Sequence, residues 1–221
     1  MKNNYVCIIP ARSGSKRLKN KNIKLLNNKP LIYWTIKMAK REKKIEKIIF
    51  SSDSEKYLKI AEGLGIDKAN LHLRPKKFAT SRSSSEETLL DVIKSKSLYK
   101  RYKNIILLQA TSPLRTFLDI TKAIQKFEKS KKSSLVSTLL INNNLVLTNK
   151  NKKIFFLKKS FRSLEVTNGA IYIINLKKFI ETKSFYHKDT QTYIMDKRSS
   201  IDIDDYYDFM MADLYLNGKK K

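Results

Sequence analysis

The chain has 221 residues, of which 41% are hydrophobic, and this supports one α/β domain over residues 1–221 and argues against two. Its formal net charge of +27 would suit a nucleic acid or an anionic membrane. Lysine is spread over the whole sequence, however, so we expect neither partner and only a field that attracts small anions. The single cysteine excludes an internal disulfide framework, and the lack of a long apolar N-terminal segment predicts a cytoplasmic protein.

Apolar runs alternate with amphipathic stretches, a pattern typical of βαβ units around a mostly parallel sheet. In chain order, we expect a strand at 5–9, a helix at 31–40, a strand at 48–50, helices at 54–64 and from 86 past 93, and a strand at 104–109. The second half continues with a helix at 118–127, strands at 134–140 and 169–175, a helix at 176–180, a strand at 193–195 and a closing helix at 206–216. The predicted architecture is a sheet flanked by helices.

The segment 142–162 interrupts this alternation. It combines asparagines and lysines with short apolar bursts such as residues 154–157. We interpret it, within the bounds 141–166, as an inserted β-rich arm that packs on a partner.

The turn after the first strand combines small residues with cations. Pro10 ends the strand because it has no N–H to donate. Residues 13–15 read Ser-Gly-Ser, which lets backbone N–H groups approach a ligand closely. Positive charge is supplied by Arg12, Lys16, Arg17 and Lys21. The order of residues matches neither a Walker A loop nor Gly-x-Gly-x-x-Gly. The turn is either an ordinary solvated basic loop or a site for phosphates.

The C-terminal part of the chain is acidic. No Lys or Arg occurs between residues 199 and 217, whereas five aspartates do. In an extended backbone Asp202 and Asp204 would point to one face and the isoleucines beside them to the core. Neighbouring carboxylates repel unless a cation lies between them, and Mg²⁺ binds carboxylate and phosphate oxygens. An alternative, in which Asp205 and Asp208 cap the closing helix, can hold at the same time.

Other kinds of catalytic centre have little support. His72 and His187 lie in no motif for a zinc site or a Ser-His-Asp triad, so we interpret them as surface or core polar residues. Cys7 lies inside the first apolar strand, where the role of a small hydrophobic residue is expected.

Short motifs follow one another along nearly the whole chain. They are IPARSGSKR at 9–17 with Lys21-Asn22, SDS at 52–54, LRP at 73–75, LQATSPLR at 108–115, NGAIY at 168–172 and SIDID at 200–204. Together they resemble the acylneuraminate cytidylyltransferases, also called CMP-sialic acid synthetases. The resemblance implies a Rossmann-like nucleotide-diphosphosugar transferase fold and a homodimer whose arm reaches over the partner's site. It also implies Mg²⁺-dependent transfer of CMP from CTP to the anomeric hydroxyl of a nonulosonic acid, of sialic or legionaminic type, with release of pyrophosphate.

By position, the resemblance places catalysis in the basic turn and the acidic pair. Arg12, Lys16 and Lys21 would bind the CTP phosphates and stabilise the leaving pyrophosphate, and Asp202 and Asp204 would hold the metal ion. The anomeric oxygen would attack the α-phosphorus in line, a reaction that depends mainly on positioning and charge neutralisation. The identity of a general base stays open.

The resemblance also implies a set of substrate-binding residues. They are Ser15, Arg74, Ala79, Ser84, Gln109 and Asn168. Among them, Arg74 and the turn at 79–84 would hold cytosine and ribose, and Gln109 would lie at the sugar.

The chain departs from the family pattern mainly on the sugar side. Ala110 replaces a usual proline and Ser81 a usual aspartate, which we expect to alter loop stiffness more than chemistry. Residues 142–145 replace a His-Pro-Leu-Lys-like stretch, and Val166 and Thr167 stand where many members carry an arginine. The lost cation would weaken the grip on the sugar carboxylate unless Lys158, Lys159 or Arg162 replaces it. Two alternatives therefore stay open, a related nucleotidyltransferase with another acceptor and a basic nucleic-acid-binding module.

Overall fold

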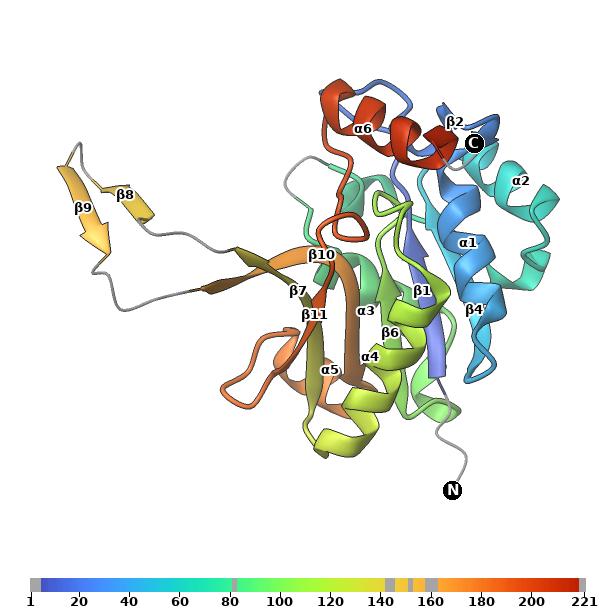
Figure 1. Cartoon of the computed structure of the whole chain (residues 1–221). Helices are drawn as coiled ribbons and strands as arrows, with labels where there is room; N and C mark the ends of the chain where they lie inside the picture. The colour runs from blue at the N-terminus through green and yellow to red at the C-terminus, as the bar shows by residue number, and fades with distance from the viewer. Residues whose placement is uncertain (1–4, 81–82, 142–145, 151–152, 158–162, 219–221) are drawn as a thin grey trace.

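The centre of the molecule is a mostly parallel β-sheet (Figure 1). A computed structural model of the chain describes residues 5–80, 83–141, 146–150, 153–157 and 163–218. Within this part of the chain, seven strands pair in the order β11-β7-β10-β6-β1-β4-β5. The strand β10 runs antiparallel to its neighbours β6 and β7, and the other neighbouring pairs are parallel. The predicted α/β class is confirmed.

The strands of this sheet are β1 (Tyr5–Pro10), β4 (Ile45–Ser52), β5 (Leu71–Leu73), β6 (Asn104–Leu108), β7 (Ser134–Ile141), β10 (Leu164–Asn175) and β11 (Gln191–Met195). The helices are α1 (Leu31–Arg41), α2 (Glu55–Gly63), α3 (Ser85–Ser95), α4 (Phe117–Ser130), α5 (Leu176–Thr182) and α6 (Tyr206–Asn217). Two small hairpins are formed by β2 (Leu25–Leu26) with β3 (Lys29–Pro30) and by β8 (Val146–Lys150) with β9 (Lys153–Leu157). Short 3-10 turns are η1 (Lys21–Ile23), η2 (Lys68–Asn70), η3 (Lys76–Phe78) and η4 (Leu98–Lys100).

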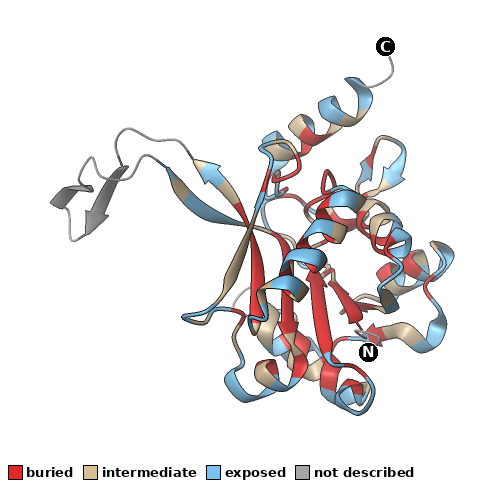
Figure 2. Cartoon of the chain, turned by 60° about the horizontal axis from the view of Figure 1, so that its bottom comes forward, coloured by how far each residue is buried: buried red, intermediate tan, exposed pale blue. Residues whose placement is uncertain are grey.

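Helices cover both faces of the sheet because β1 is apolar on both sides. Tyr5, Cys7 and Ile9 pack on one face with side chains of α1, α2 and α4. Val6 and Ile8 pack on the other face with side chains of α3 and α5. Figure 2 shows the buried strands between these layers. Cys7 is the small core residue that was predicted, and its burial raises the pKa of its thiol to about 12.

A third hydrophobic cluster joins the two ends of the chain. Its members are Leu18, Leu26, Leu31, Leu114, Ile203, Phe209 and Ala212. Ile203 is fully buried, while Asp202 and Asp204 on either side of it keep contact with solvent, which confirms the predicted alternation. The cluster packs α6 against the β2–β3 hairpin, and it brings the acidic segment to the basic turn (Figure 1).

The strands β7 and β10 continue beyond the body of the sheet (Figure 1). Their pairing runs out to Leu164 opposite Ile141, with a register shift between Thr167 and Tyr172. Farther along, β8 and β9 form a separate two-stranded sheet. The β-structure expected for this segment is therefore present at residues 146–150 and 153–157. Its role as a dimerisation arm stays a prediction.

Some features were missed by the sequence prediction. The edge strand β5 and the β2–β3 hairpin are too short to carry a periodic pattern. The strand β10 begins at Leu164, earlier than predicted, and its first part was missed because most of those residues are exposed and form no apolar run. Several predicted positions lie outside the described residues, namely Ser81, 142–145, Lys158, Lys159 and Arg162. Among the helices that the structure describes, none has the length and apolar character needed to span a membrane.

Candidate active site

A cavity of about 430 Å³ opens at the edge of the sheet where parallel strands end. Its walls come from the turn after β1, from the segment 74–88 after β5, from the turn after β6 and from Asp204. The chain passes from β1 to β4 and β5 on one side and then crosses to β6 on the other side, so the strand order switches at β1. Such a switch point leaves a crevice at the carboxyl ends of the strands, which is where open α/β sheets bind ligands.

The basic turn is fixed by hydrogen bonds from its neighbours. The backbone N–H and the hydroxyl of Ser13 both donate to the carboxylate of Asp53, each at 2.8 Å. Asn22 Nδ2 donates to the carbonyl of Arg12 at 2.9 Å, and Arg12 Nη1 donates to the carbonyl of Thr80 at 2.8 Å. The last bond crosses to the segment 74–88. The turn is therefore preorganised, and its cations stand at the mouth of the cavity.

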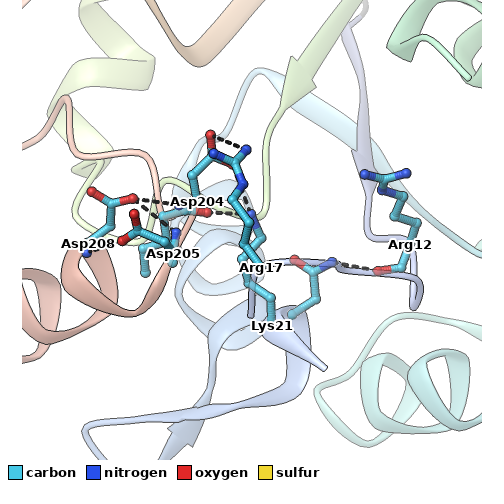
Figure 3. A network of polar contacts seen from close by, with 8 residues as sticks. Arg12, Arg17, Lys21, Asp204, Asp205 and Asp208 are labelled. Carbon is cyan, nitrogen blue, oxygen red and sulfur yellow. Dashed lines mark hydrogen bonds and ion pairs between the residues drawn. The ribbon is translucent and has the colours of Figure 1, made fainter. Parts of the chain in front are cut away.

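Asp204 meets two cations of the basic turn (Figure 3). Its carboxylate accepts from Arg17 Nη2 at 3.0 Å and from Lys21 Nζ at 3.3 Å. Lys21 Nζ also donates to the carbonyl of Ile203. The side chain of Arg17 is 67% exposed and that of Lys21 only 12%, so the Lys21 pair is less screened by water.

The N-terminus of α6 is capped by other aspartates of the same segment. The Asp205 carboxylate accepts from the N–H of Asp208, and the Asp208 carboxylate accepts from the N–H groups of Asp204 and Asp205 (Figure 3). The predicted cap is therefore confirmed. It uses only the backbone of Asp204, so the carboxylate of Asp204 can serve the cavity.

Asp202 lies beside the cavity and not among its lining residues. A Cβ atom placed on Gly169, whose φ is +74°, would stand 3.7 Å from Oδ2 of Asp202. The surrounding protein desolvates the Asp202 carboxyl and raises its pKa above the ordinary value, and repulsion from Asp204 adds to the increase. A hydrogen bond with Thr111 and the charge of Lys21 act in the opposite direction. A cation beside this pair would relieve the repulsion.

The wall opposite the basic turn is anchored by a buried arginine. Arg74 is 6% exposed, and its Nε and Nη2 donate to the hydroxyl and the carbonyl of Ser51 at 3.3 and 3.0 Å. Burial lowers the pKa of Arg74 to about 10, while the nearby Asp53 carboxylate opposes that shift. The guanidinium stays charged at neutral pH.

Hydroxyl groups line the wall between Arg74 and the turn after β6. Ser84 caps α3 through a reciprocal pair of bonds with Glu87. Gln109 Nε2 donates to Ser85 Oγ at 3.1 Å, which ties the end of β6 to the start of α3. These bonds fix the wall without using the cations of the cavity.

The structure brings most of the predicted site residues together. Those that line the cavity are Arg12, Ser15, Lys16, Lys21, Arg74, Ser84, Gln109 and Asp204. Ala79, Asn168 and Asp202 do not line it. Asn168 accepts from Ser137 Oγ at 2.6 Å and donates to Ser200 Oγ at 2.9 Å, so its amide links β7 and β10 to the acidic segment.

Sequence reasoning missed other lining residues, most of which carry a hydroxyl or an amide. They are Asn22, Ser85, Thr88 and Thr111, whereas Arg17 was expected to supply charge, and Thr80 and Ser83 belong to the turn at 79–84 that was expected to hold cytosine and ribose. The clustering of serine and threonine over residues 80–88 was a usable signal. Thr88 could have been found from helical spacing, because it follows Ser84 by one turn.

Arg115 supports the floor of the site from within the core. It is 2% exposed, and its Nη1 donates to the carbonyls of Gln109 and Ala170 at 3.2 and 2.7 Å. Its Nη2 donates to Thr35 Oγ1 at 2.8 Å. Burial lowers the pKa of Arg115 to about 10. Arg115 joins α1, β10 and the turn after β6. The sequence around it, TSPLR at 111–115, does not indicate this role.

The carboxylates at the cavity do not form a complete metal site by themselves. Within the part of the chain that the structure describes, no group of three His, Cys, Asp or Glu side chains could hold a metal ion. Asp202 and Asp204 offer only a partial set of oxygen ligands. A substrate with phosphate oxygens would have to complete it.

Comparison with solved structures shows the fold. CMP:2-keto-3-deoxy-manno-octonic acid synthetase, solved in complex with CTP, superimposes with a TM-score of 0.74 at 13% identity and covers 98% of this chain and 99% of that one. The 4-diphosphocytidyl-2C-methyl-D-erythritol synthase of Anaerococcus prevotii gives a TM-score of 0.70 at 15% identity, over 97% and 96% of the two chains. Both support the predicted nucleotidyltransferase fold.

Two curated relatives differ in how much of their length is shared. N-acylneuraminate cytidylyltransferase of Escherichia coli O18:K1:H7 is 38% identical over 96% of this chain, but the chain spans only 52% of that protein. CMP-N,N'-diacetyllegionaminic acid synthase of Legionella pneumophila is 32% identical over 94% of both proteins. The chain thus spans about half of one relative and nearly all of the other.

The match to a family model covers almost the whole sheet and the candidate site. The model for cytidylyltransferases matches residues 6–215, from the first strand to the closing helix. The resemblance inferred from the short motifs is thereby confirmed. This protein belongs to the cytidylyltransferase family.

Proposed function

We propose that this protein transfers CMP from CTP to the anomeric hydroxyl of a nonulosonic acid of sialic or legionaminic type and releases pyrophosphate. The observation that carries the proposal is the cavity in which cations of the N-terminal turn face Asp204 from the other end of the chain. A nucleoside triphosphate needs both fixed positive charge and carboxylates that can hold a divalent cation. The names of the relatives from E. coli and L. pneumophila support the acceptor class.

The basic turn would bind the triphosphate and the leaving pyrophosphate. Arg12, Lys16 and Lys21 line the cavity, and Ser15 lies between them in the sequence. In an in-line displacement at the α-phosphorus, negative charge accumulates on the leaving group. Cations held in place before the reaction stabilise that charge without a further cost of reorganisation. The bonds from Ser13 to Asp53 supply this rigidity.

The wall around Arg74 would bind the cytidine. Arg74 uses Nε and Nη2 on Ser51, and among the described residues Nη1 has no hydrogen-bond partner, so it can donate to a carbonyl oxygen or a ring nitrogen of the base. Ser84 and the other hydroxyl groups of the wall suit the ribose. Gln109 lines the cavity directly after β6, far from the basic turn in the sequence. We assign it to the acceptor sugar.

Asp202 and Asp204 fit Mg²⁺ as a partial ligand set. Both supply oxygen, and repulsion from Asp204 adds to the desolvation that raises the pKa of Asp202. When bound, Mg²⁺ would neutralise negative charge on the phosphates. A thermal-shift titration tests the site. MgCl₂ with CTP should raise the Tm of the wild type more than CTP alone, and Asp202→Asn should remove most of the difference.

We also propose that the protein is a homodimer joined through the segment 141–166. The β8–β9 hairpin pairs only within itself among the described strands. The sequence from 142 to 163 carries lysines, an arginine and apolar residues but no acid, whereas residues 199–217 carry no Lys or Arg. This complementarity favours contact between the arm of one subunit and the acidic segment of the other.

The decisive experiment measures pyrophosphate release by the purified protein with CTP, Mg²⁺ and a panel of nonulosonic acids. We expect release with at least one acid of the sialic or legionaminic type and none with ATP in place of CTP. Absence of release with every acid, together with absence of CTP binding by calorimetry, would contradict the enzyme proposal.

The acceptor panel also separates the remaining alternatives. CTP binding without turnover on any nonulosonic acid would indicate a related nucleotidyltransferase with another sugar acceptor. A gel shift with DNA or RNA at moderate salt addresses the nucleic-acid alternative. We expect no sequence-independent binding that survives about 0.2 M salt, because phosphate contacts alone weaken steeply with ionic strength.

A further inference from the structure

A row of buried polar side chains lies behind Arg74, away from the phosphate chemistry. Ser51 is the second-to-last residue of β4, His72 lies opposite it in β5, and Asp91 belongs to α3. Ser51 is 0% exposed, and His72 and Arg74 are each 6% exposed. Polar groups at such depth must hydrogen-bond to one another or destabilise the fold. Neither His72 nor Asp91 has a role in the transfer described above.

The hydrogen bonds in this row point in one direction. Arg74 Nε can only donate, so the Ser51 hydroxyl accepts from it at 3.3 Å. The Ser51 hydroxyl can then donate its own proton to His72 Nδ1 at 3.0 Å, an arrangement that requires a lone pair on this nitrogen. The remaining ring proton sits on Nε2, which is 3.2 Å from Oδ2 of Asp91. A neutral His72 with its proton on Nε2 directs that proton toward Asp91, whose buried Oδ2 makes no other polar contact among the described residues.

A protonated His72 would break this order. Its Nδ1 would become a donor and compete with Arg74 for the same hydroxyl oxygen, and its charge would repel the guanidinium. The charged groups that face His72 are Asp91 from α3, Lys96 directly after α3 and Arg74 from the loop after β5. Burial lowers the pKa of His72, Lys96 and Arg74 act in the same direction, and Asp91 opposes them. His72 is therefore neutral at pH 7.

We propose that His72, oriented by Asp91, is a positioning residue that fixes Arg74 through the Ser51 hydroxyl so that Nη1 of Arg74 is presented to the base of CTP. This inference rests on the proposed function, in which Arg74 contacts the nucleobase. Because the hydrogen bonds run from Arg74 to Ser51 and from Ser51 to His72, the contact between Arg74 and the base also depends on a neutral His72. Acidification should then weaken nucleotide binding before it affects the phosphate contacts.

Steady-state kinetics separates positioning from catalysis. His72→Phe removes both ring nitrogens, and we expect the KM for CTP to rise roughly 5-fold with little change in kcat, as for loss of one buried hydrogen bond. His72→Asn keeps an acceptor near the position of Nδ1 and should recover most of the affinity. His187→Asn, which changes the other histidine outside the cavity, is the matched control and should behave as the wild type.

The pH dependence of the KM for CTP distinguishes a positioning role of His72 from a merely structural one, which would not make this KM depend on pH. The ratio of the KM for CTP of the wild type to that of His72→Asn should increase as the pH falls from 8 to 5.5. Protonation of CTP itself cancels in this ratio. An unchanged KM in His72→Phe, or a ratio that stays flat with pH, would overturn the proposal while leaving the enzyme activity intact.

NMR tests the row without any nucleotide. Long-range ¹H–¹⁵N correlation spectra of the imidazoles at pH 7 should show His72 with the proton on Nε2 and Nδ1 as an acceptor. Asp91→Asn should alter this signal and leave that of His187 unchanged. A His72 that carries its proton on Nδ1, or is charged at pH 7, would refute the proposal even if the protein bound no CTP.

Discussion

The nucleotide side and the arm side of this molecule are built in different ways. Around the cavity, polar side chains are held by short contacts within one chain, as Ser13 is by Asp53 and Gln109 by Ser85. Along the extension of β7 and β10, apolar side chains stay uncovered, and Leu140 and Val166 are 40% and 44% exposed. Figure 2 shows how the burial of the sheet fades along this extension.

The difference indicates what each side can do alone. A wall whose polar groups are already satisfied is preorganised and can bind its ligand without a partner. A pair of strands with exposed apolar side chains and free edges is an interaction surface. We therefore expect a single subunit to bind CTP and a second subunit to be required for efficient transfer to the acid.

Shortening the arm is the strongest test of the difference between the nucleotide side and the arm side. Ile141 and Leu164 face each other across the antiparallel pair, so a short turn can replace the residues between Ile141 and Ser163. We expect this variant to sediment as a monomer, to bind CTP in calorimetry with unchanged affinity, and to lose about 100-fold or more in transfer, as expected for a misplaced acceptor. A variant that stays dimeric, or that loses CTP binding, would contradict the division between the two sides.

Asp204→Asn tests the nucleotide side with nearly as large an effect. We expect turnover to fall about 100-fold, the size typical for loss of one group that stabilises charge in a reaction, with little change in Tm. The matched control is Asp205→Ala, which removes the cap of α6 and should cost about 1 kcal/mol of stability. Equal losses of activity and stability in Asp204→Asn would instead assign Asp204 to the cap.

Lys21→Ala should have a smaller effect that is confined to the nucleotide. Because Lys21 lines the cavity and pairs with Asp204, its loss should raise the KM for CTP about 10-fold, as expected for a charge-assisted contact. Lys19→Ala changes an exposed lysine of the same turn that does not line the cavity, and it should leave the KM unchanged. Identical behaviour of the two variants would reduce the role of Lys21 to general positive charge.

Salt should produce the smallest effect. The net charge of +27 attracts CTP over a distance, so raising KCl from about 0.05 to 0.3 M should increase the KM for CTP a few-fold at constant kcat. The KM for the singly charged acid should change less. A KM for CTP that is independent of salt would show that only the contacts within the cavity matter.

The sequence was sufficient for the parts of the site that depend on local patterns. The basic turn after a buried strand and the alternating Asp202-Ile203-Asp204 segment have signatures that are readable residue by residue. The two segments meet because the cluster around Leu26 and Phe209 packs parts of the chain that are far apart in the sequence. Only the motif resemblance indicated this contact.

The parts that escaped prediction depend on pairing across the fold. The strand β5 has three residues and owes its conformation to β4, so His72 could not be placed next to Ser51 from sequence. Arg115 follows a stretch of small polar residues, yet it is buried because the backbone carbonyls that it satisfies come from Gln109 and Ala170. Long-range acceptors of this kind leave no local signal.

The cluster that fastens α6 to the turn after β1 has a consequence for biosynthesis. A ribosome makes the Arg12 turn well before Asp204, and the two can meet only after α6 has left the exit tunnel. A chain that lacks the acidic segment has the cations but neither Asp202 nor Asp204, and under the proposed function we expect it to be unable to use CTP.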